Sequence, residues 1–248
     1  MSLNDDQIER YARHIILKEV GGPGQQKLMS AKVLVIGAGG LGSPLLMYLA
    51  AAGIGTIGII DDDQVDLSNL QRQIIHTTGA LGTDKVTSAK NMILEMNPHI
   101  NVVTYAERLE ENNAIDILSS YDIVADGCDN FTTRFLVNAI CLKNKIPLIS
   151  GALSQFDGQL ATFKGYEDDK PCYRCLVPDH PRGVLSCAEA GILGAVAGVV
   201  GTMQAVEVIK EILNIGDGLA GKLLIYDAFS ASTRTIKLPK DPGCKHCN

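Results

Sequence analysis

Two pairs of cysteines, each with two residues between its members, have a spacing with recognisable chemistry. Cys172 and Cys175 stand in "PCYRC", and Cys244 and Cys247 stand in "CKHC" near the last residue. Two such pairs are typical of a tetrahedral structural zinc site, in which four thiolates leave no open position for catalysis. A thioredoxin-like redox pair and a chance repeat are the alternatives. We therefore expect zinc (Zn²⁺) to fix the C-terminal segment and the chemistry to lie elsewhere.

A glycine-rich string, "GAGGLG", is the second candidate. Gly37, Gly39 and Gly42 have the G-x-G-x-x-G spacing, with Gly40 between them, after the apolar run "VLVI" and before a helical pattern. Such glycines let the backbone turn tightly, so that amide N–H groups and the positive end of a helix face a phosphate. Asp61 ends the next apolar run, "TIGII", where a carboxylate can accept hydrogen bonds from ribose hydroxyls. The arrangement favours a nucleotide site over a structural turn.

Polar side chains are concentrated in the segment after Asp61, which carries Asp63, Asn69, Arg72 and Lys85. Cations beside a glycine-rich loop suit a triphosphate whose charge must be neutralised during bond breaking, and hydride transfer does not require them. Each cation also has a plain interpretation. Arg72 can pair with a surface carboxylate, and Lys85 can lie on a solvated helix start. A cation is mildly unfavourable at that end of a helix, which makes Lys85 the more informative of the two.

The string "ADGCDN" places Asp126 and Asp129 after a later apolar run. In an open α/β sheet this position lies at the carboxyl edge, where ligands bind. A carboxylate there can hold magnesium (Mg²⁺) against phosphates. It can equally cap the following helix, with Asp129 or Asn130 as the N-cap residue. The residues alone leave both interpretations open.

The elements that must position these side chains alternate between strand-like and helix-like patterns. Residues 31–150 predict a Rossmann-like, doubly wound and mainly parallel α/β sheet. The N-terminal string "NDDQIERYARHIIL" predicts a helix with a capping box formed by Asn4 and Gln7, ended by a break at "GGPG". Farther on, "GQLATFKG" and "KLLIYDAFSASTRTIKLP" predict antiparallel strands, separated by a long helix beginning near Ala188. We expect one domain over 1–248, with an N-terminal helical segment (1–30), a nucleotide-binding core (31–150) and a partner-binding and zinc-knuckle part (151–248).

The composition narrows the class of protein. The chain has 248 residues, 46% of them hydrophobic, with a formal net charge of -6. This is typical of a soluble globular protein and argues against non-specific nucleic-acid binding. The apolar stretch 190–205 is shorter than the roughly 20 residues that span a membrane, so it predicts a core helix. No leader pattern occurs at the first residues, which predicts a cytoplasmic protein.

Three strings carry a resemblance to a known family: "GAGGLGSPLLMYLAAAGIGTIGIIDDDQVDLSNLQRQ", "GTDKVTSAK" and "CDNFTTR". Together with the paired C-x-x-C motifs they resemble the bacterial adenylyltransferases of the MoeB/ThiF type, within the ubiquitin-activating superfamily. The resemblance covers nearly the whole chain. It implies that ATP activates the C-terminal glycine carboxylate of a small ubiquitin-like sulfur-carrier protein in molybdopterin or thiamine biosynthesis, with release of pyrophosphate.

The resemblance also implies roles for individual residues. It assigns Gly37, Gly39 and Gly42 to the phosphate turn, Asp61 to the ribose and Asp129 to magnesium. It further implies that Asn69, Arg72 and Lys85 hold and polarise the phosphates, and that Arg13 reaches the nucleotide from the partner subunit of a homodimer.

Two further predictions concern the role of Cys187 and the source of sulfur. The resemblance places Cys187 near the cysteine that relatives use for thioester formation, and an incidental thiol is the alternative. Because the sequence ends at the second cysteine pair, we expect sulfur to come from a separate donor protein. A nicotinamide-dependent oxidoreductase with the same glycine pattern, and a non-enzymatic nucleotide-binding scaffold, are the competing functions.

Overall fold

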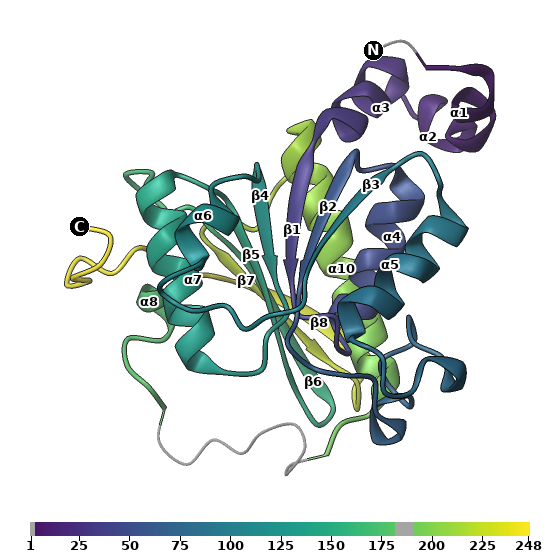
Figure 1. The fold of residues 1–248 in the computed structure, drawn as a ribbon. Coiled ribbons are helices and arrows are strands. Elements are labelled where there is room, and N and C mark those ends of the chain that lie inside the picture. Colours follow the sequence, from purple (N-terminus) through teal and green to yellow (C-terminus); the bar gives the residue numbers. More distant parts are fainter. Residues whose placement is uncertain (1–2, 182–190) are drawn as a thin grey trace.

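The computed structural model describes residues 3–181 and 191–248, which form an eight-stranded sheet with helices on both faces (Figure 1). The strand order is β3-β2-β1-β4-β5-β6-β7-β8. The first five of these pair in parallel and the last three in antiparallel fashion. The strands are β1 (Lys32–Ile36), β2 (Thr56–Ile60), β3 (Asn101–Tyr105), β4 (Ile123–Asp126), β5 (Leu148–Ser154), β6 (Asp157–Phe163), β7 (Lys222–Asp227) and β8 (Ser232–Lys237).

The helices form two layers and a separate N-terminal group. Helices α4, α5 and α10 cover one face of the sheet, and α6, α7 and α8 lie on the other (Figure 1). Their bounds are α1 (Asp5–Arg10), α2 (Ala12–Ile15), α3 (Gly21–Ser30), α4 (Gly42–Ala52), α5 (Lys85–Met96), α6 (Ala114–Leu118), α7 (Phe131–Asn144), α8 (Tyr173–Leu176) and α10 (Gly194–Leu213), with 3-10 turns η1 (Leu67–Asn69) and η2 (Thr78–Ala80). The predicted doubly wound α/β fold is confirmed.

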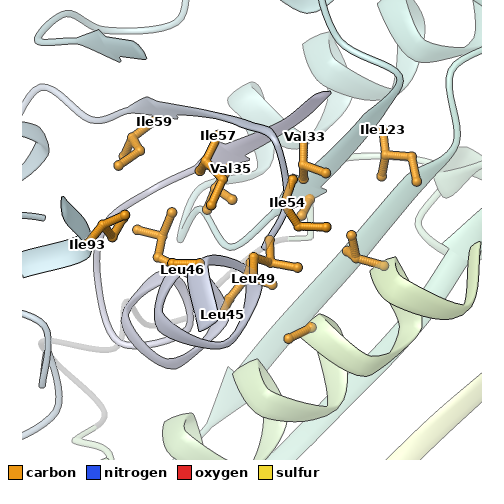
Figure 2. Packing of buried hydrophobic residues seen from close by; sticks show 14 of the residues in the cluster. Val33, Val35, Leu45, Leu46, Leu49, Ile54, Ile57, Ile59, Ile93 and Ile123 are labelled. Atoms are coloured by element: carbon orange, nitrogen blue, oxygen red, sulfur yellow. The ribbon is translucent and has the colours of Figure 1, made fainter. Parts of the chain in front are cut away.

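Side chains in β1 alternate between the two layers, as expected for a strand covered on both faces. Val33 and Val35 pack in the cluster with α4 and α5, whereas Leu34 and Ile36 pack in the cluster with α6 and α7. Figure 2 shows the first cluster, in which the leucines of α4 lie against the valines and isoleucines of β1 and β2. This packing fixes the start of α4 at the end of β1, where the glycine-rich turn lies.

The N-terminal helices lie at the edge of the sheet from which the parallel strands start (Figure 1). The predicted capping box is confirmed, because Gln7 N donates to Asn4 Oδ1 at 2.9 Å and Asn4 N donates to Gln7 Oε1 at 3.1 Å. The buried ring of Tyr11 packs against Gly53, and its hydroxyl accepts a hydrogen bond from Asn97 Nδ2 at 2.9 Å. The expected break at "GGPG" is wrong: these residues form the first turn of α3, where proline is tolerated because early amide groups have no intrahelical partner.

The C-terminal part follows the predicted pattern with one refinement. The string 222–239 forms two strands, β7 and β8, that pair as an antiparallel hairpin at the edge of the sheet. Ala188, where we expected a long helix to begin, lies outside the described residues; residues 194–205 of the apolar stretch belong to α10, which packs on α4 and on β5 and β6 as a core helix. None of the helices in the described ranges is both long and apolar enough to cross a bilayer.

Candidate nucleotide site and cysteine cluster

A pocket of about 400 Å³ opens at the carboxyl ends of β1, β2 and β4. The strand order reverses between β1 and β4, and open α/β sheets bind ligands at such a switch point. The pocket brings together most of the residues that the sequence singled out. They are Gly37, Gly39, Gly40, Asp61, Asp63, Arg72, Lys85 and Asp129.

The glycine turn needs its glycines for two different reasons. Gly37 has a φ of 90°, a conformation that side chains disfavour. A Cβ on Gly42 would overlap the carbonyl oxygen of Gly37, so only glycine allows α4 to begin so close to the end of β1. Gly39 has no such constraint, whereas a Cβ on Gly40 would crowd Ala197, and both glycines line the pocket. The turn therefore presents backbone amides and the positive end of α4 to whatever anion binds there.

Asp61 lies where β2 ends and holds the glycine turn from the side. Its carboxylate accepts hydrogen bonds from the backbone amides of Ala38, at 2.8 Å, and Asp63, at 2.9 Å. Burial raises the pKa of this carboxyl above its ordinary range, although the charge of Lys85 and the two amides act in the opposite direction. Asp61 thus fixes the turn while facing the pocket.

Lys85 is the first residue of α5, and its side chain is only 5% exposed. Its Nζ donates to Asp63 Oδ2 at 2.7 Å, and its backbone amide donates to the carbonyl oxygen of Asp63 at 2.9 Å. The Asp63 side chain is 66% exposed, so solvent weakens this ion pair. The structure excludes the solvated helix start considered for Lys85 and places a buried cation at the pocket wall.

The segment from 69 to 76 lies directly on the glycine turn. Aliphatic atoms of Arg72 approach Gly40, and the side-chain amide of Gln73 lies beside Gly39. His76 bridges two elements: its Nε2 is 2.9 Å from the carbonyl oxygen of Ala38 and its Nδ1 is 2.9 Å from Ser88 Oγ in α5. Since a carbonyl only accepts, the Nε2–H donates to Ala38 and Ser88 donates to Nδ1. Burial lowers the pKa of His76, which keeps the ring neutral in this role.

Asp126 has a structural partner instead of facing the pocket. Its Oδ2 accepts from Arg134 Nη1 at 3.0 Å and from Ser150 Oγ at 2.9 Å, and all three side chains are buried. Arg134 also donates to the carbonyl oxygens of Cys128 and Gly151. This network holds the loop after β4, at the tip of which the exposed Asp129 lines the pocket.

The capping question at this loop has a clear answer. Asn130 is the N-cap residue of α7, because its Oδ1 accepts from the amide of Thr133 at 2.9 Å. The side chain of Asp129 therefore does not cap the helix and lines the pocket at its rim.

Asn69 and Arg13 do not line the pocket of this chain. Asn69 Oδ1 accepts a hydrogen bond from Gln73 Nε2 at 2.6 Å. Arg13 is exposed on α2, at the sheet edge opposite to the pocket (Figure 1). Cys187 lies outside the described residues. Gln73, His76 and Arg134 were not found from the sequence, because their side chains become informative only through the atoms they contact.

The four paired cysteines meet as the spacing predicts. Sγ–Sγ distances are 4.0 Å for Cys172–Cys175, 3.8 Å for Cys172–Cys244 and 3.5 Å for Cys175–Cys247. All four sulfurs lie within 4.8 Å of one another. Four sulfurs around a tetrahedral zinc ion at ~2.3 Å would be about 3.8 Å apart, so the donor set fits zinc. The cluster joins the C-terminal segment to α8.

The fold and the pocket together define a Rossmann-like α/β protein with a glycine turn, a buried lysine and a four-cysteine cluster. Residues 11–246 match the model of the ThiF family, and the chain belongs to that family.

Three relatives are similar over almost the whole chain. The adenylyltransferase and sulfurtransferase MOCS3 of Anopheles gambiae is 47% identical over 99% of this chain and 56% of its own length. The sulfur carrier protein adenylyltransferase of Thermus thermophilus is 45% identical over 100% of this chain and 93% of its own. The SAMP-activating enzyme E1 of Haloferax volcanii is 43% identical over 100% of this chain and 91% of its own length. The chain spans only a little over half the length of the MOCS3 proteins it matches.

Solved structures confirm the fold. E. coli MccB with ATP superposes with a TM-score of 0.84 at 24% identity, covering 99% of this chain and 75% of that one. PaaA superposes with a TM-score of 0.78 at 26% identity, covering 97% and 76%.

Proposed function

We propose that this protein is an adenylyltransferase that uses ATP to activate the C-terminal glycine carboxylate of a small ubiquitin-like sulfur-carrier protein. The observation that carries the proposal is the convergence of the glycine turn, Asp61, Arg72 and Lys85 on one pocket in a ThiF-family chain. The names of the relatives from Thermus thermophilus and Haloferax volcanii, an adenylyltransferase and an activating enzyme, support the same reaction. Neither name describes an oxidoreductase.

In the proposed reaction a carrier carboxylate attacks the α-phosphate, and pyrophosphate leaves. Both reactants are anions, so the site must reduce their repulsion and stabilise the leaving group. We assign phosphate binding to the turn amides and to Arg72 and Lys85, and ribose binding to Asp61. The buried position of Lys85 strengthens its interaction with an arriving phosphate, because water screens it less.

The charge of the pocket supports two further assignments. Its lining contains five acidic residues, Asp61, Asp62, Asp63, Glu107 and Asp129, against four basic ones, Arg72, Lys85, Arg108 and Arg134. A triphosphate entering such a pocket requires additional positive charge. We assign this charge to Mg²⁺, which Asp129 would hold and which would neutralise phosphate charge, and to Arg13 of a second copy. Arg13 lies on α2, which is at the other edge of the sheet, and does not line the pocket of its own chain, which favours action in a homodimer.

The cysteine cluster is proposed to hold zinc in a structural role, and Cys187 is proposed to act after adenylation. All four cysteines of the cluster bind through thiolates, so no ligand position remains for substrate. A separate protein is proposed to donate sulfur to the activated carrier.

Carrier-dependent exchange of labelled pyrophosphate into ATP tests the function directly. We expect exchange with wild-type protein, and a loss of ~10²–10³ in rate for Arg72→Ala and for Lys85→Ala, by analogy with other preorganised electrostatic sites. Lys90→Ala, at a partly exposed position in the same helix, is the matched control and should exchange normally. Exchange near the wild-type rate in a well-folded Arg72→Ala protein would contradict the assignment.

Two measurements separate the competing functions. Binding of ATP but not NAD⁺ to the purified protein is expected for an adenylyltransferase. Incubation with ATP and each candidate carrier, followed by mass measurement, should reveal an added adenylate on one carrier. ATP binding without exchange in the presence of any carrier would instead support a nucleotide-binding scaffold.

A further inference from the structure

Gln73 buries a polar atom that has no partner, at the wall of the nucleotide pocket. Within residues 3–181 and 191–248, the buried side-chain atoms without a hydrogen bond are Gln73 Oε1 and Gln204 Oε1. Gln204 lies in α10 and does not line the pocket, whereas Gln73 does. The Gln73 side chain lies beside Gly39, with the residue only 4% exposed. A buried oxygen without a donor is costly, so this atom needs an explanation.

A chain of hydrogen bonds fixes which end of the Gln73 amide is left without a partner. Ser68 Oγ is 2.5 Å from Asp66 Oδ1, and an ionised carboxylate can only accept, so the serine hydroxyl donates. Hydrogen bonds from Ser68 lower the pKa of Asp66, which keeps that carboxylate ionised at neutral pH. Ser68 Oγ must then accept from Asn69 Nδ2, at 3.3 Å.

The same direction continues to Gln73. Since Asn69 uses its amide nitrogen toward Ser68, its Oδ1 faces Gln73 and accepts from Gln73 Nε2 at 2.6 Å. The oxygen of Gln73 therefore remains without a donor. Reversing the amide would set Gln73 Oε1 against Asn69 Oδ1, two acceptors that repel. Each donated bond in such a chain also polarises the next amide and makes its oxygen a better acceptor.

We propose that Gln73 Oε1 accepts a hydrogen bond from an O–H group that the nucleotide and its metal ion bring into the pocket. The proposal rests on the proposed binding of ATP. Phosphate oxygens in the phosphate turn carry no proton at neutral pH and would be repelled by this oxygen. The O–H donors close to the phosphates of a metal–nucleotide complex are the ribose hydroxyls and metal-bound water. Gln73 is thus assigned as a binding residue that accepts a hydrogen bond from the bound complex, beside the cations that bind the phosphates.

The test is the dissociation constant for ATP, measured by titration calorimetry on the full chain. Gln73→Leu removes the acceptor at similar side-chain size, and we expect about tenfold weaker binding, as for the loss of one hydrogen bond to a desolvated partner. Gln26→Leu, an exposed glutamine on α3 at the opposite sheet edge, is the matched control and should bind as wild type does. Thermal unfolding without nucleotide checks that each variant is folded. If Gln73→Leu does not fold, ATP binding is measured on Gln73→Met in its place.

Two further arms identify the donor. If a ribose hydroxyl donates, 2′-deoxy-ATP or 3′-deoxy-ATP should abolish the difference between wild type and Gln73→Leu. If metal-bound water donates, the difference should disappear when ATP is titrated without magnesium. A difference that survives in every arm, or no difference with Mg²⁺–ATP, would overturn the proposal. A wild-type protein that does not bind ATP would instead overturn the proposed function.

Discussion

Replacing Arg134 with methionine should destabilise the protein more than a single surface change can. The guanidinium of Arg134 donates four hydrogen bonds, to Asp126 Oδ2, Ser150 Oγ and the carbonyl oxygens of Cys128 and Gly151. Methionine fills similar space but leaves the carboxylate of Asp126, which is 1% exposed, without its counter-charge. Removing one partner of a buried ion pair costs ~3–5 kcal/mol. Asp126 retains two donors, Ser150 Oγ and the amide of Cys128, so we expect a cost near the lower end of this range.

Chemical denaturation of Arg134→Met measures this free energy of unfolding, and the thermal midpoint should fall by roughly 10 °C for a chain of this size. Arg234→Met, on the exposed strand β8, is the matched control and should change stability by less than ~0.5 kcal/mol. Adding Asp126→Asn to Arg134→Met should recover part of the loss, because it removes the uncompensated charge. A free energy for Arg134→Met within about 1 kcal/mol of the control would refute the argument that this pair fixes the loop.

Three other predictions follow from the same structure. Gly39→Ala should fold normally but bind ATP poorly, because its new Cβ has room yet lies on the pocket wall. Gly42→Ala should be strongly destabilised, because its Cβ would overlap the carbonyl oxygen of Gly37. Unfolding and ATP-binding measurements on both variants check this, and equal stabilities would contradict the distinction. Because burial lowers the pKa of His76, its contribution to stability is present above about pH 6.5 and lost as the pH falls through the lowered value. Unfolding free energies at about pH 7.5 and about pH 5 should therefore differ less for His76→Gln than for wild type, and an unchanged difference would argue against this role. Chelation of metal should make the C-terminal segment sensitive to limited proteolysis before ATP affinity changes, and simultaneous loss of both would contradict a purely structural cluster.

The arrangement of the fold could be predicted from the sequence because its signals are local. Apolar runs of strand length, helical patterns between them and a glycine turn after the first strand define βαβ units without any long-range information. The break expected at "GGPG" was wrong for an equally physical reason. The burial of Leu28 in the core and the hydrogen bond from the buried Gln25 Nε2 to the carbonyl oxygen of Ala52 hold α3 in place, and this tertiary packing outweighs the weak helix propensity of glycine.

The candidate site was predictable where residue type and spacing carry the chemistry, as for the glycines, Asp61 and the four cysteines. It was not predictable where a role depends on the partner atom. Nothing in the string "SNLQRQ" distinguishes Gln71 from Gln73, yet one is exposed and the other lies on the glycine turn. At "ADGCDN", too, the contacts and not the string show that Asp126 pairs with Arg134 and that Asn130, not Asp129, caps α7.

Lys85 and Arg134 illustrate how the surroundings of a buried cation determine its use. Burial acts to lower the pKa of Arg134, but Asp126 and neighbouring groups raise it. Its two terminal nitrogens donate to four acceptors, which makes it a structural cation. Lys85 is as deeply buried, yet its ion-pair partner, Asp63, is mostly solvated and therefore holds it weakly. It also lies at the positive end of α5, where a cation is unfavourable and an arriving anion is doubly stabilised. A protein that needed Lys85 only for stability would gain from moving that charge into water, and its buried position therefore supports the phosphate-binding role proposed for it.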